Sequence, residues 1–225
     1  MSEIEAVIKI GGELVLDGEA SSRLLKEILN NVYAGRRLLV LCGGGVLSDH
    51  IRELYARKLI SDEAAHWMAV LSMDQQAHIL IDRGFNVKLI YDPSQVKQTV
   101  ESRCLPVLLA YRYLRLNDEL PHNWSVTSDS IAAYIAFKTD ARFLILVKNV
   151  NGLYPSPEIE EDKLIPVIKS SSLNPVKHRV VDEYLREILR LKPSFKCWLI
   201  NGYHPERLTE LLETGRTIGT EIIIT

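Results

Sequence analysis

Short runs of apolar residues alternate with longer amphipathic stretches from one end of this chain to the other, and no other feature limits its fold as strongly. The short runs are rich in Val, Ile and Leu and are nearly continuous in hydrophobicity, as expected of strands buried on both faces. The longer stretches repeat apolar residues at helical spacing. Strands separated by helices predict βαβ units. We therefore expect a three-layer α/β/α sandwich with a mainly parallel central sheet.

The expected elements follow from this pattern and from the capping signals at their ends. Strands are expected over 4–10, 38–41, 86–91, 105–110, 143–147, 196–200 and 219–225. Helices are expected over 18–33, 46–58, 61–83, 93–102, 127–138, part of 174–191, and 205–214. Asp17 is the expected N-cap of the first helix, which Gly35 ends. Loops are expected over 116–124 and 149–163, and with no repeat or linker we expect one domain over 1–225.

Composition and charge exclude several classes of protein. The 225 residues are 47% hydrophobic, which excludes a disordered chain, and no apolar run approaches the roughly 20 residues that span a membrane. A net charge of −2 argues against a nucleic-acid partner. The three cysteines lie in apolar runs without metal-ligand spacing, so we expect buried thiols and no metal site. The N-terminus lacks the pattern of a signal peptide, and we expect a cytoplasmic location.

The first candidate site residue is a lysine within a predicted buried strand. Lys9 lies two residues before the pair Gly11 and Gly12. A buried ammonium is costly without a partner, and glycines let an anion approach the backbone closely. This combination favours an anion site at the end of the strand. The alternative is a strand-edge lysine that reaches solvent, followed by an ordinary turn.

A second glycine-rich loop follows the next predicted strand. Gly43, Gly44 and Gly45 precede a predicted helix, whose N-terminal amides and dipole favour an anion. One alternative is a tight strand-to-helix turn. Another is a degenerate dinucleotide fingerprint, but the acidic strand end that it requires is replaced by a predicted helix. No P-loop motif is present.

The third feature is Asp129, in the first turn of the helix predicted from Thr127 or Ser128. A carboxylate at this position either stabilises the helix dipole or holds lysine side chains in a phosphate site. The residues alone leave both interpretations open.

These features occur in the order found in the amino acid kinase superfamily, which the chain resembles along nearly its whole length. The similar segments are Lys9–Gly12, Gly43–Gly45, Thr127–Ala133, Lys148–Tyr154, and Asn201-Gly202 with Gly219–Ile222. Each motif alone is weak, but five in order at sensible spacings are specific. The resemblance implies an acceptor side over roughly 1–140 and a nucleotide side over roughly 141–225.

The resemblance also implies ATP-dependent phosphorylation of a small acidic or phosphorylated acceptor, with Mg²⁺. Lys9 would stabilise charge on the transferring phosphoryl group, and Asp129 would orient that lysine. Gly11 and Gly12 would donate amides to the phosphates, and Gly43, Gly44 and Gly45 would hold the acceptor. The remaining nucleotide-side candidates are Lys148, Asn149, Gly152, Tyr154, Pro157 and Lys177.

The chain departs from the family pattern at several positions. Glu13 stands where Ser or Thr is frequent, Lys148 replaces the usual Thr, and Asn151 replaces the usual Asp. The second lysine motif, Gly-Gly-Met-x-x-Lys, is missing, and Lys177 or Lys148 is the candidate to supply its charge. A non-catalytic nucleotide- or ligand-binding member of the family is therefore an alternative.

Segments 61–75 and 121–130 look most like the branch that phosphorylates aminomethylfuran-methyl phosphate to its diphosphate in methanofuran biosynthesis. Glu63, His66, His122 and Trp124 then become acceptor-site candidates, with the indole stacking on a flat ring and the histidines meeting phosphate. The alternative for each of the three aromatic residues is a structural role in its helix or loop. Other acceptors, such as UMP, an amino acid or a phosphonate, also remain open. Related kinases assemble as dimers to hexamers, and we expect a homo-oligomer.

Overall fold

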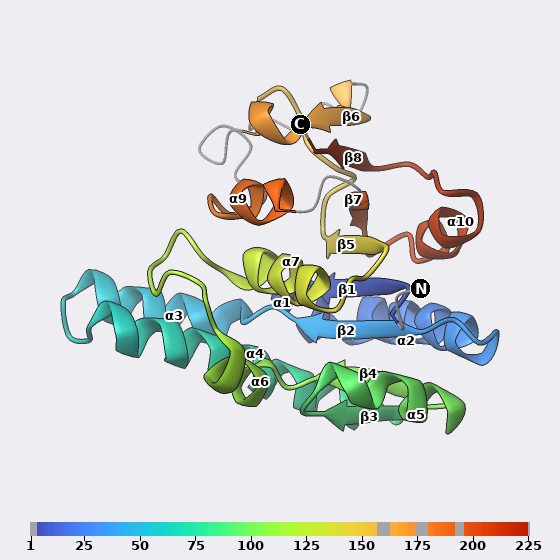
Figure 1. Cartoon of the computed structure of the whole chain (residues 1–225), viewed down its shortest axis with the longest axis horizontal. Helices are drawn as coiled ribbons and strands as arrows, with labels where there is room; N and C mark the ends of the chain where they lie inside the picture. The colour runs from blue at the N-terminus through green and yellow to red at the C-terminus, as the bar shows by residue number, and fades with distance from the viewer. Residues whose placement is uncertain (1–3, 157–162, 174–179, 192–195, 225) are drawn as a thin grey trace.

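The computed structural model is built on one eight-stranded sheet, and it describes residues 4–156, 163–173, 180–191 and 196–224. The strand order is β3-β4-β2-β1-β5-β7-β8-β6 (Figure 1). The strands are β1 (Ala6–Ile10), β2 (Leu38–Cys42), β3 (Val87–Ile90), β4 (Leu105–Leu108), β5 (Phe143–Lys148), β6 (Val167–Lys169), β7 (Lys196–Asn201) and β8 (Thr220–Ile223).

Helices connect most of these strands. They are α1 (Gly12–Leu16), α2 (Gly18–Tyr33), α3 (Gly45–Ala56), α4 (Asp62–Asp82), α5 (Val96–Glu101), α6 (Ala110–Asn117), α7 (Ser128–Lys138), α9 (Leu185–Arg190) and α10 (Glu206–Thr214). Short 3-10 turns span Pro93–Gln95 and Ser170–Ser172. Asp17 caps α2 as predicted, because its carboxylate accepts the amide of Ala20 at 3.0 Å.

The described strand pairs are parallel except β7 with β8, which is antiparallel. In the centre of the sheet, β1 lies between β2 and β5, so that Lys9 is level with Leu41 on one side and Leu146 on the other. The carboxyl ends of β1, β2 and β5 therefore meet at one edge. This is the edge at which ligands bind in open α/β sheets.

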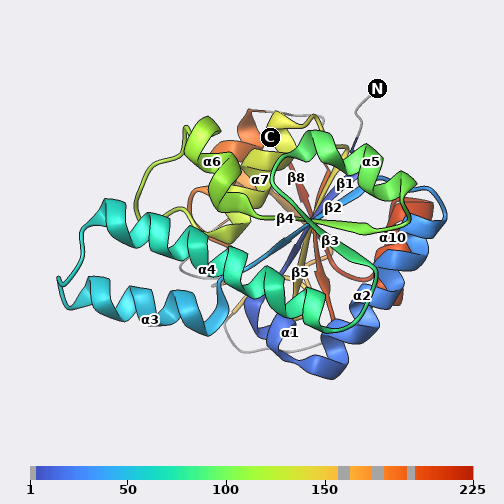
Figure 2. The same ribbon diagram turned by 90° about the horizontal axis from the view of Figure 1, so that it is seen from below.

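Helices cover both faces of the sheet. Figure 2 shows α5, α6 and α7 on one side and α1, α2 and α10 on the other. Helices α3 and α4 run side by side and extend beyond the sheet (Figures 1 and 2). The three-layer α/β/α architecture predicted from the sequence is confirmed.

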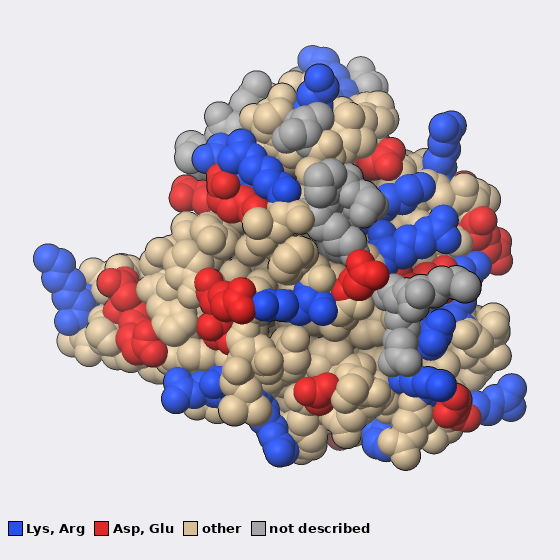
Figure 3. Space-filling model, in the orientation of Figure 1, with Lys and Arg blue, Asp and Glu red and all other residues tan. Residues whose placement is uncertain are grey.

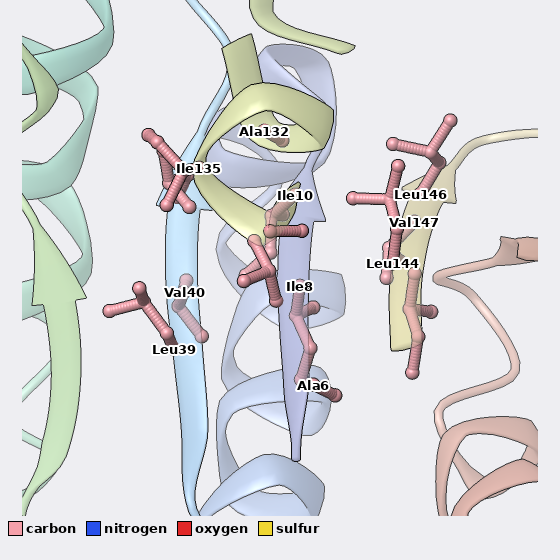
Figure 4. Close-up of a cluster of buried hydrophobic side chains, with 14 of the residues drawn as sticks. Ala6, Ile8, Ile10, Leu39, Val40, Ala132, Ile135, Leu144, Leu146 and Val147 are labelled. Atoms are coloured by element: carbon pink, nitrogen blue, oxygen red, sulfur yellow. The ribbon is translucent and has the colours of Figure 1, made fainter. Parts of the chain in front are cut away.

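The core lies along the central strands. Every residue of β1 and β2 is buried, as the continuous hydrophobic runs predicted. Figure 4 shows Ile8 and Ile10 of β1 between Val40 of β2 and Leu144 of β5, with Ile135 of α7 close by. Nearly complete burial of large branched side chains on both faces fixes the sheet between its helices.

Three short elements differ from the sequence-based expectation. The predicted strand to residue 110 ends at Leu108, and Ala110–Asn117 forms helix α6, which the sequence reading missed. Asp74 accepts the amide of Tyr111 at 3.3 Å, so a carboxylate from α4 satisfies the start of α6. The three-residue strand β6 and the one-turn helix α1 were also missed. Within 174–191, the described helix begins only at Leu185.

The surface carries charges of both signs. On the face in Figure 3, Lys and Arg are interspersed with Asp and Glu. No helix in the described part of the chain is long and apolar enough to span a lipid bilayer.

Removing side-chain volume from β1 should destabilise the whole sheet. Ile8 is completely buried, and we expect Ile8→Ala to lower the free energy of unfolding by about 2–5 kcal/mol. Leu116→Ala is the matched control, because Leu116 is 80% exposed and the change should stay within about 0.5 kcal/mol. Urea titration of both variants measures the difference. Equal losses would show that β1 is not the centre of the core.

Candidate functional site

Two lysines and one aspartate meet where β1 and β5 end. The ammonium of Lys9 lies 2.9 Å from one carboxylate oxygen of Asp129, and the ammonium of Lys148 lies 2.7 Å from the other. The side chains of Lys9, Asp129 and Lys148 are 5%, 3% and 16% exposed. Of the two candidates for the second lysine, Lys148 contacts Asp129, and Lys177 lies outside the described residues. Two buried ammonium groups share one contacting carboxylate, an arrangement suited to receive an anion.

Burial and charge shift the pKa of each group in this cluster. Burial lowers the pKa of Lys9 to about 8, assisted by the Lys148 ammonium and opposed by Asp129. Burial also disfavours the charged forms of Asp129 and Lys148, but their mutual attraction outweighs it. The pKa of Asp129 falls to about 2, and the pKa of Lys148 is raised. Asp129 is therefore ionised at neutral pH.

Helix α7 presents Asp129 in its first turn, and a second aspartate holds that turn in place. The carboxylate of Asp182 accepts the backbone amides of Thr127, Ser130 and Leu185 and the hydroxyls of Thr127 and Ser130. Thr127 is the N-cap residue, as predicted, but its own side chain caps no amide. Asp182 therefore acts as a long-range cap, and burial raises its pKa.

The two glycine-rich loops touch one another next to the lysines. A Cβ on Gly12 would lie 2.3 Å from the amide nitrogen of Gly45, and a Cβ on Gly43 would lie 3.3 Å from the Lys9 ammonium. A Cβ on Gly44 would lie 2.2 Å from the hydroxyl of Ser72. Glycine is required here because the backbones approach more closely than any side chain allows.

One pocket opens beside the two lysines, and we call it the nucleotide-side pocket after the side that the family resemblance predicts. It is lined by Lys9, Gly11, Gly12, Glu13, Leu14, Lys148, Asn149, Val150 and Val180. The side-chain amide of Asn149 donates to the Glu13 carboxylate at 2.7 Å across it. The amide of Gly11 already donates to the Val147 carbonyl at 2.9 Å, so Gly11 provides close packing rather than the free donor that was predicted.

A second pocket opens on the other side of the glycine contact and encloses about 490 Å³, part of it open to solvent. Part of its lining is polar, formed by Gly44, Ser48, Thr127 and Ser128. Its apolar part is formed by Ala65, Ala69, Val70, Met73, Val126 and Ile131. The rest of the lining is Arg52, Asp62, His66, Asn123 and Trp124, of which Arg52, Asp62 and Asn123 are exposed. Helix α3 begins beside Gly44, where its N-terminal amides favour an anion, whereas amides at the start of α7 are bonded to Asp182.

A cluster of four polar side chains fixes the wall that carries Trp124. His66 and His122 direct their Nε2 atoms to the same Asp118 oxygen, at 3.3 and 3.1 Å. The other ring nitrogen of His122 bonds to Glu63, and Glu63 also accepts the Trp67 indole N–H at 2.6 Å. The cluster therefore ties the loop after α6 to α4.

The same atoms, from His66, Asp118 and His122, lie within 4.8 Å of one another, as metal ligands do. The two imidazoles, however, are stacked, with centroids 4.1 Å apart and planes at 13°. Imidazole binds a metal in its ring plane at roughly 2.0–2.1 Å, so two stacked rings cannot direct both nitrogens to one ion. The geometry is that of a hydrogen-bonded cluster.

The predicted site residues lie in different places in the structure. Lys9, Gly12, Lys148, Asn149 and Asp129 come together around the nucleotide-side pocket, and Gly44, His66 and Trp124 line the other pocket. Gly43 packs against Lys9 and Gly12, Gly45 packs against Gly12, and Glu63 and His122 bond to each other outside the pocket lining. Gly152 and Tyr154 are buried and line neither pocket. Pro157 and Lys177 lie outside the described residues.

Sequence reasoning missed Asp182, Asp118 and Arg52 as site residues, and it left open whether Glu63 or Asp62 contacts an amine on the acceptor. Asp182 and Asp118 act through contacts that bring distant segments together, which no local pattern reveals. Arg52 carried no signal beyond its place on an amphipathic helix.

The His122 bridge predicts a pH dependence of stability. Burial lowers the pKa of His122, but Glu63 and Asp118 outweigh this effect, and the pKa is raised. The bridge therefore stabilises the native state fully below the unfolded pKa of about 6.5, and this is lost as the pH rises through the folded pKa. We expect the stability difference between the native chain and His122→Gln to shrink over that rise, in urea titrations at several pH values.

The control for this series is His50→Gln, because the side chain of His50 is 70% exposed. This variant should differ little from the native chain at any pH. A His122→Gln difference that stays constant or grows as the pH rises would contradict the bridging role of a protonated His122.

Comparison with known proteins agrees with this geometry. The profile of the amino acid kinase family matches residues 5–178. The [5-(aminomethyl)furan-3-yl]methyl phosphate kinase of Methanocaldococcus jannaschii is 28% identical over 220 residues, which cover 96% of this chain and 97% of that protein. A uridylate kinase of Methanoregula boonei is 25% identical, covering 93% and 92%.

Solved structures show the same fold. The uridylate kinase of Archaeoglobus fulgidus superposes with a TM-score of 0.70 at 21% identity, covering 97% of this chain and all of that one. The UMP kinase of Ureaplasma parvum gives 0.69 at 16% identity, covering 98% of this chain. The matching profile extends over well more than half of the sequence, and the chain belongs to the amino acid kinase family.

Proposed function

We propose that this protein transfers the γ-phosphoryl group of ATP to [5-(aminomethyl)furan-3-yl]methyl phosphate, giving the diphosphate and ADP. One observation carries the proposal: the Lys9–Asp129–Lys148 cluster borders one pocket, and Ser128, next to Asp129 in the sequence, lines a second. One pocket holds the triphosphate donor and the other the acceptor. The acceptor identity is supported by the relative from Methanocaldococcus jannaschii, similar along nearly its entire length.

The chemistry needs no general base. An ionised oxygen of the acceptor phosphate attacks the γ-phosphorus of ATP, the new P–O bond forms, and the bond to the β–γ bridging oxygen breaks to release ADP. The two ammonium groups neutralise charge on the transferring group and on the departing β-phosphate. Asp129 keeps both ammonium groups aimed at this point and prevents their mutual repulsion from separating them.

The nucleotide-side residues fit a bound ATP. The pocket lies directly against the two ammonium groups, and the missing Cβ of Gly12 leaves the backbone accessible. Mg²⁺ would bind mainly through the phosphates and neutralise part of their charge. Among the residues that line this pocket, Glu13 is the one that carries a carboxylate.

The acceptor-side pocket suits a flat phosphorylated molecule. Its lining includes Gly44, at which helix α3 begins, and the N-terminal amides of that helix favour a phosphate. Trp124 and the small residues Ala65 and Ala69 bound a narrow apolar space in which a ring can lie. UMP is the alternative acceptor, suggested by the structural likeness to uridylate kinases. A homo-oligomeric state and a cytoplasmic location stay predictions from the sequence.

Removing either lysine should abolish most of the turnover. We expect Lys9→Ala and Lys148→Ala each to lower kcat by about 10²–10³, the usual loss when one preorganised electrostatic group is removed. The measurement is ADP release from Mg-ATP with the aminomethylfuran phosphate as acceptor. The control is Lys97→Ala, an exposed lysine on α5 far from the site, which should retain full activity.

An acceptor panel decides between this function and its alternatives. The panel includes UMP, isopentenyl phosphate, glutamate, acetylglutamate and fosfomycin. Preferred turnover of one of these would reassign the acceptor and keep the phosphotransfer chemistry. ATP binding without ADP release from any acceptor would favour a non-catalytic binder, and full activity of Lys9→Ala would contradict the proposed mechanism.

A further inference from the structure

We propose that Asp62 makes the acceptor pocket selective for a molecule that carries an ammonium group at the end opposite its phosphate. This inference rests on the proposed function and names the side chain that reads the amine of the acceptor. Among the residues that line the acceptor pocket, Asp62 is the one that carries a carboxylate. Arg52 is the one that carries a permanently charged basic side chain.

Asp62 is an exposed residue of the pocket lining and the first residue of α4. Ser61 caps this helix by accepting the amide of Ala64 at 3.2 Å, so the first turn that carries Asp62 is fixed. The hydroxyl of Tyr55, near the end of α3, lies against the Asp62 carboxylate, and this contact raises the pKa of Tyr55. Both helices run side by side here (Figure 2). The carboxylate is thus held at the pocket mouth by its neighbours.

The other acidic groups around the pocket are already engaged. Glu63 bonds to Trp67 and His122, Asp118 bonds to two imidazoles and the amide of Leu120, and Asp129 pairs with two lysines. Within the described residues, no Lys, Arg or His lies within ion-pair distance of Asp62. Its negative charge is therefore available to a ligand.

Arg52 does not neutralise Asp62, because its guanidinium lies over the Trp124 ring, 4.7 Å from the centroid. Tyr55 packs against the same indole at 6.0 Å. These contacts hold Trp124 in the pocket lining. The lining therefore combines the N-terminus of α3, which favours an anion, with a carboxylate that favours a cation.

The experiment compares two acceptors that differ in one group. The first is [5-(aminomethyl)furan-3-yl]methyl phosphate, and the second has a hydroxymethyl group in place of the aminomethyl group. For Asp62→Asn, we expect KM for the amine to rise roughly tenfold with kcat nearly unchanged, because a charge-assisted hydrogen bond is lost. KM for the hydroxymethyl analogue and for ATP should stay within about twofold.

The matched control is Glu53→Gln, which removes a carboxylate that is 76% exposed on α3 and outside the pocket lining. It should leave both acceptors unaffected. A loss of the same size for both acceptors in Asp62→Asn would overturn the inference and assign Asp62 a structural role, while leaving the proposed function intact. Failure of the native chain to phosphorylate either compound would overturn the proposed function, and the inference with it.

Discussion

The site depends on one buried interaction, the sharing of the Asp129 carboxylate by Lys9 and Lys148. Each ammonium comes from the end of a different central strand, and the two would repel one another without the carboxylate between them. Asp129 is itself placed by α7, whose first turn is held by Asp182. A carboxylate that serves two buried cations leaves positive charge for a phosphate to neutralise. The same interaction therefore positions the lysines and leaves positive charge that favours the binding of an anionic ligand.

The contact between the two glycine loops determines how the backbone packs around this charge cluster. Gly12 ends the link from β1 and Gly45 starts α3, and their backbones touch because neither carries a Cβ. Gly12 lines the nucleotide-side pocket, and Gly44, the neighbour of Gly45, lines the acceptor-side pocket. Phosphoryl transfer needs donor and acceptor in line at short distance, and under the proposed function the close approach of the two glycine loops would support that arrangement.

The sequence predicted what is local and missed what is assembled over long distances. The parallel sheet, Lys9, the glycine loops and Asp129 could be predicted, because each lies in a strand, turn or helix start with its own local pattern. Helix α6 was missed because the group that satisfies its N-terminus is Asp74 from α4. The same holds for Asp182 at α7. Lys148 was one of two candidates for the second lysine, and only the pairing of β1 with β5 shows that its ammonium reaches Asp129.

The residues proposed to select the acceptor lie on other elements than the residues proposed to bind the phosphates. The lysines and glycines belong to the sheet and to helix starts, which related kinases with other acceptors share as a fold. The acceptor wall, by contrast, is formed by the loop after α6 and the outer ends of α3 and α4, and it is held by charged and aromatic contacts rather than by the sheet. Such contacts can change without disturbing the core. Under the proposed function, selectivity could therefore diverge at Asp62, Trp124 and the His66–His122 cluster, while Lys9, Lys148 and Asp129 would keep the phosphate chemistry unchanged.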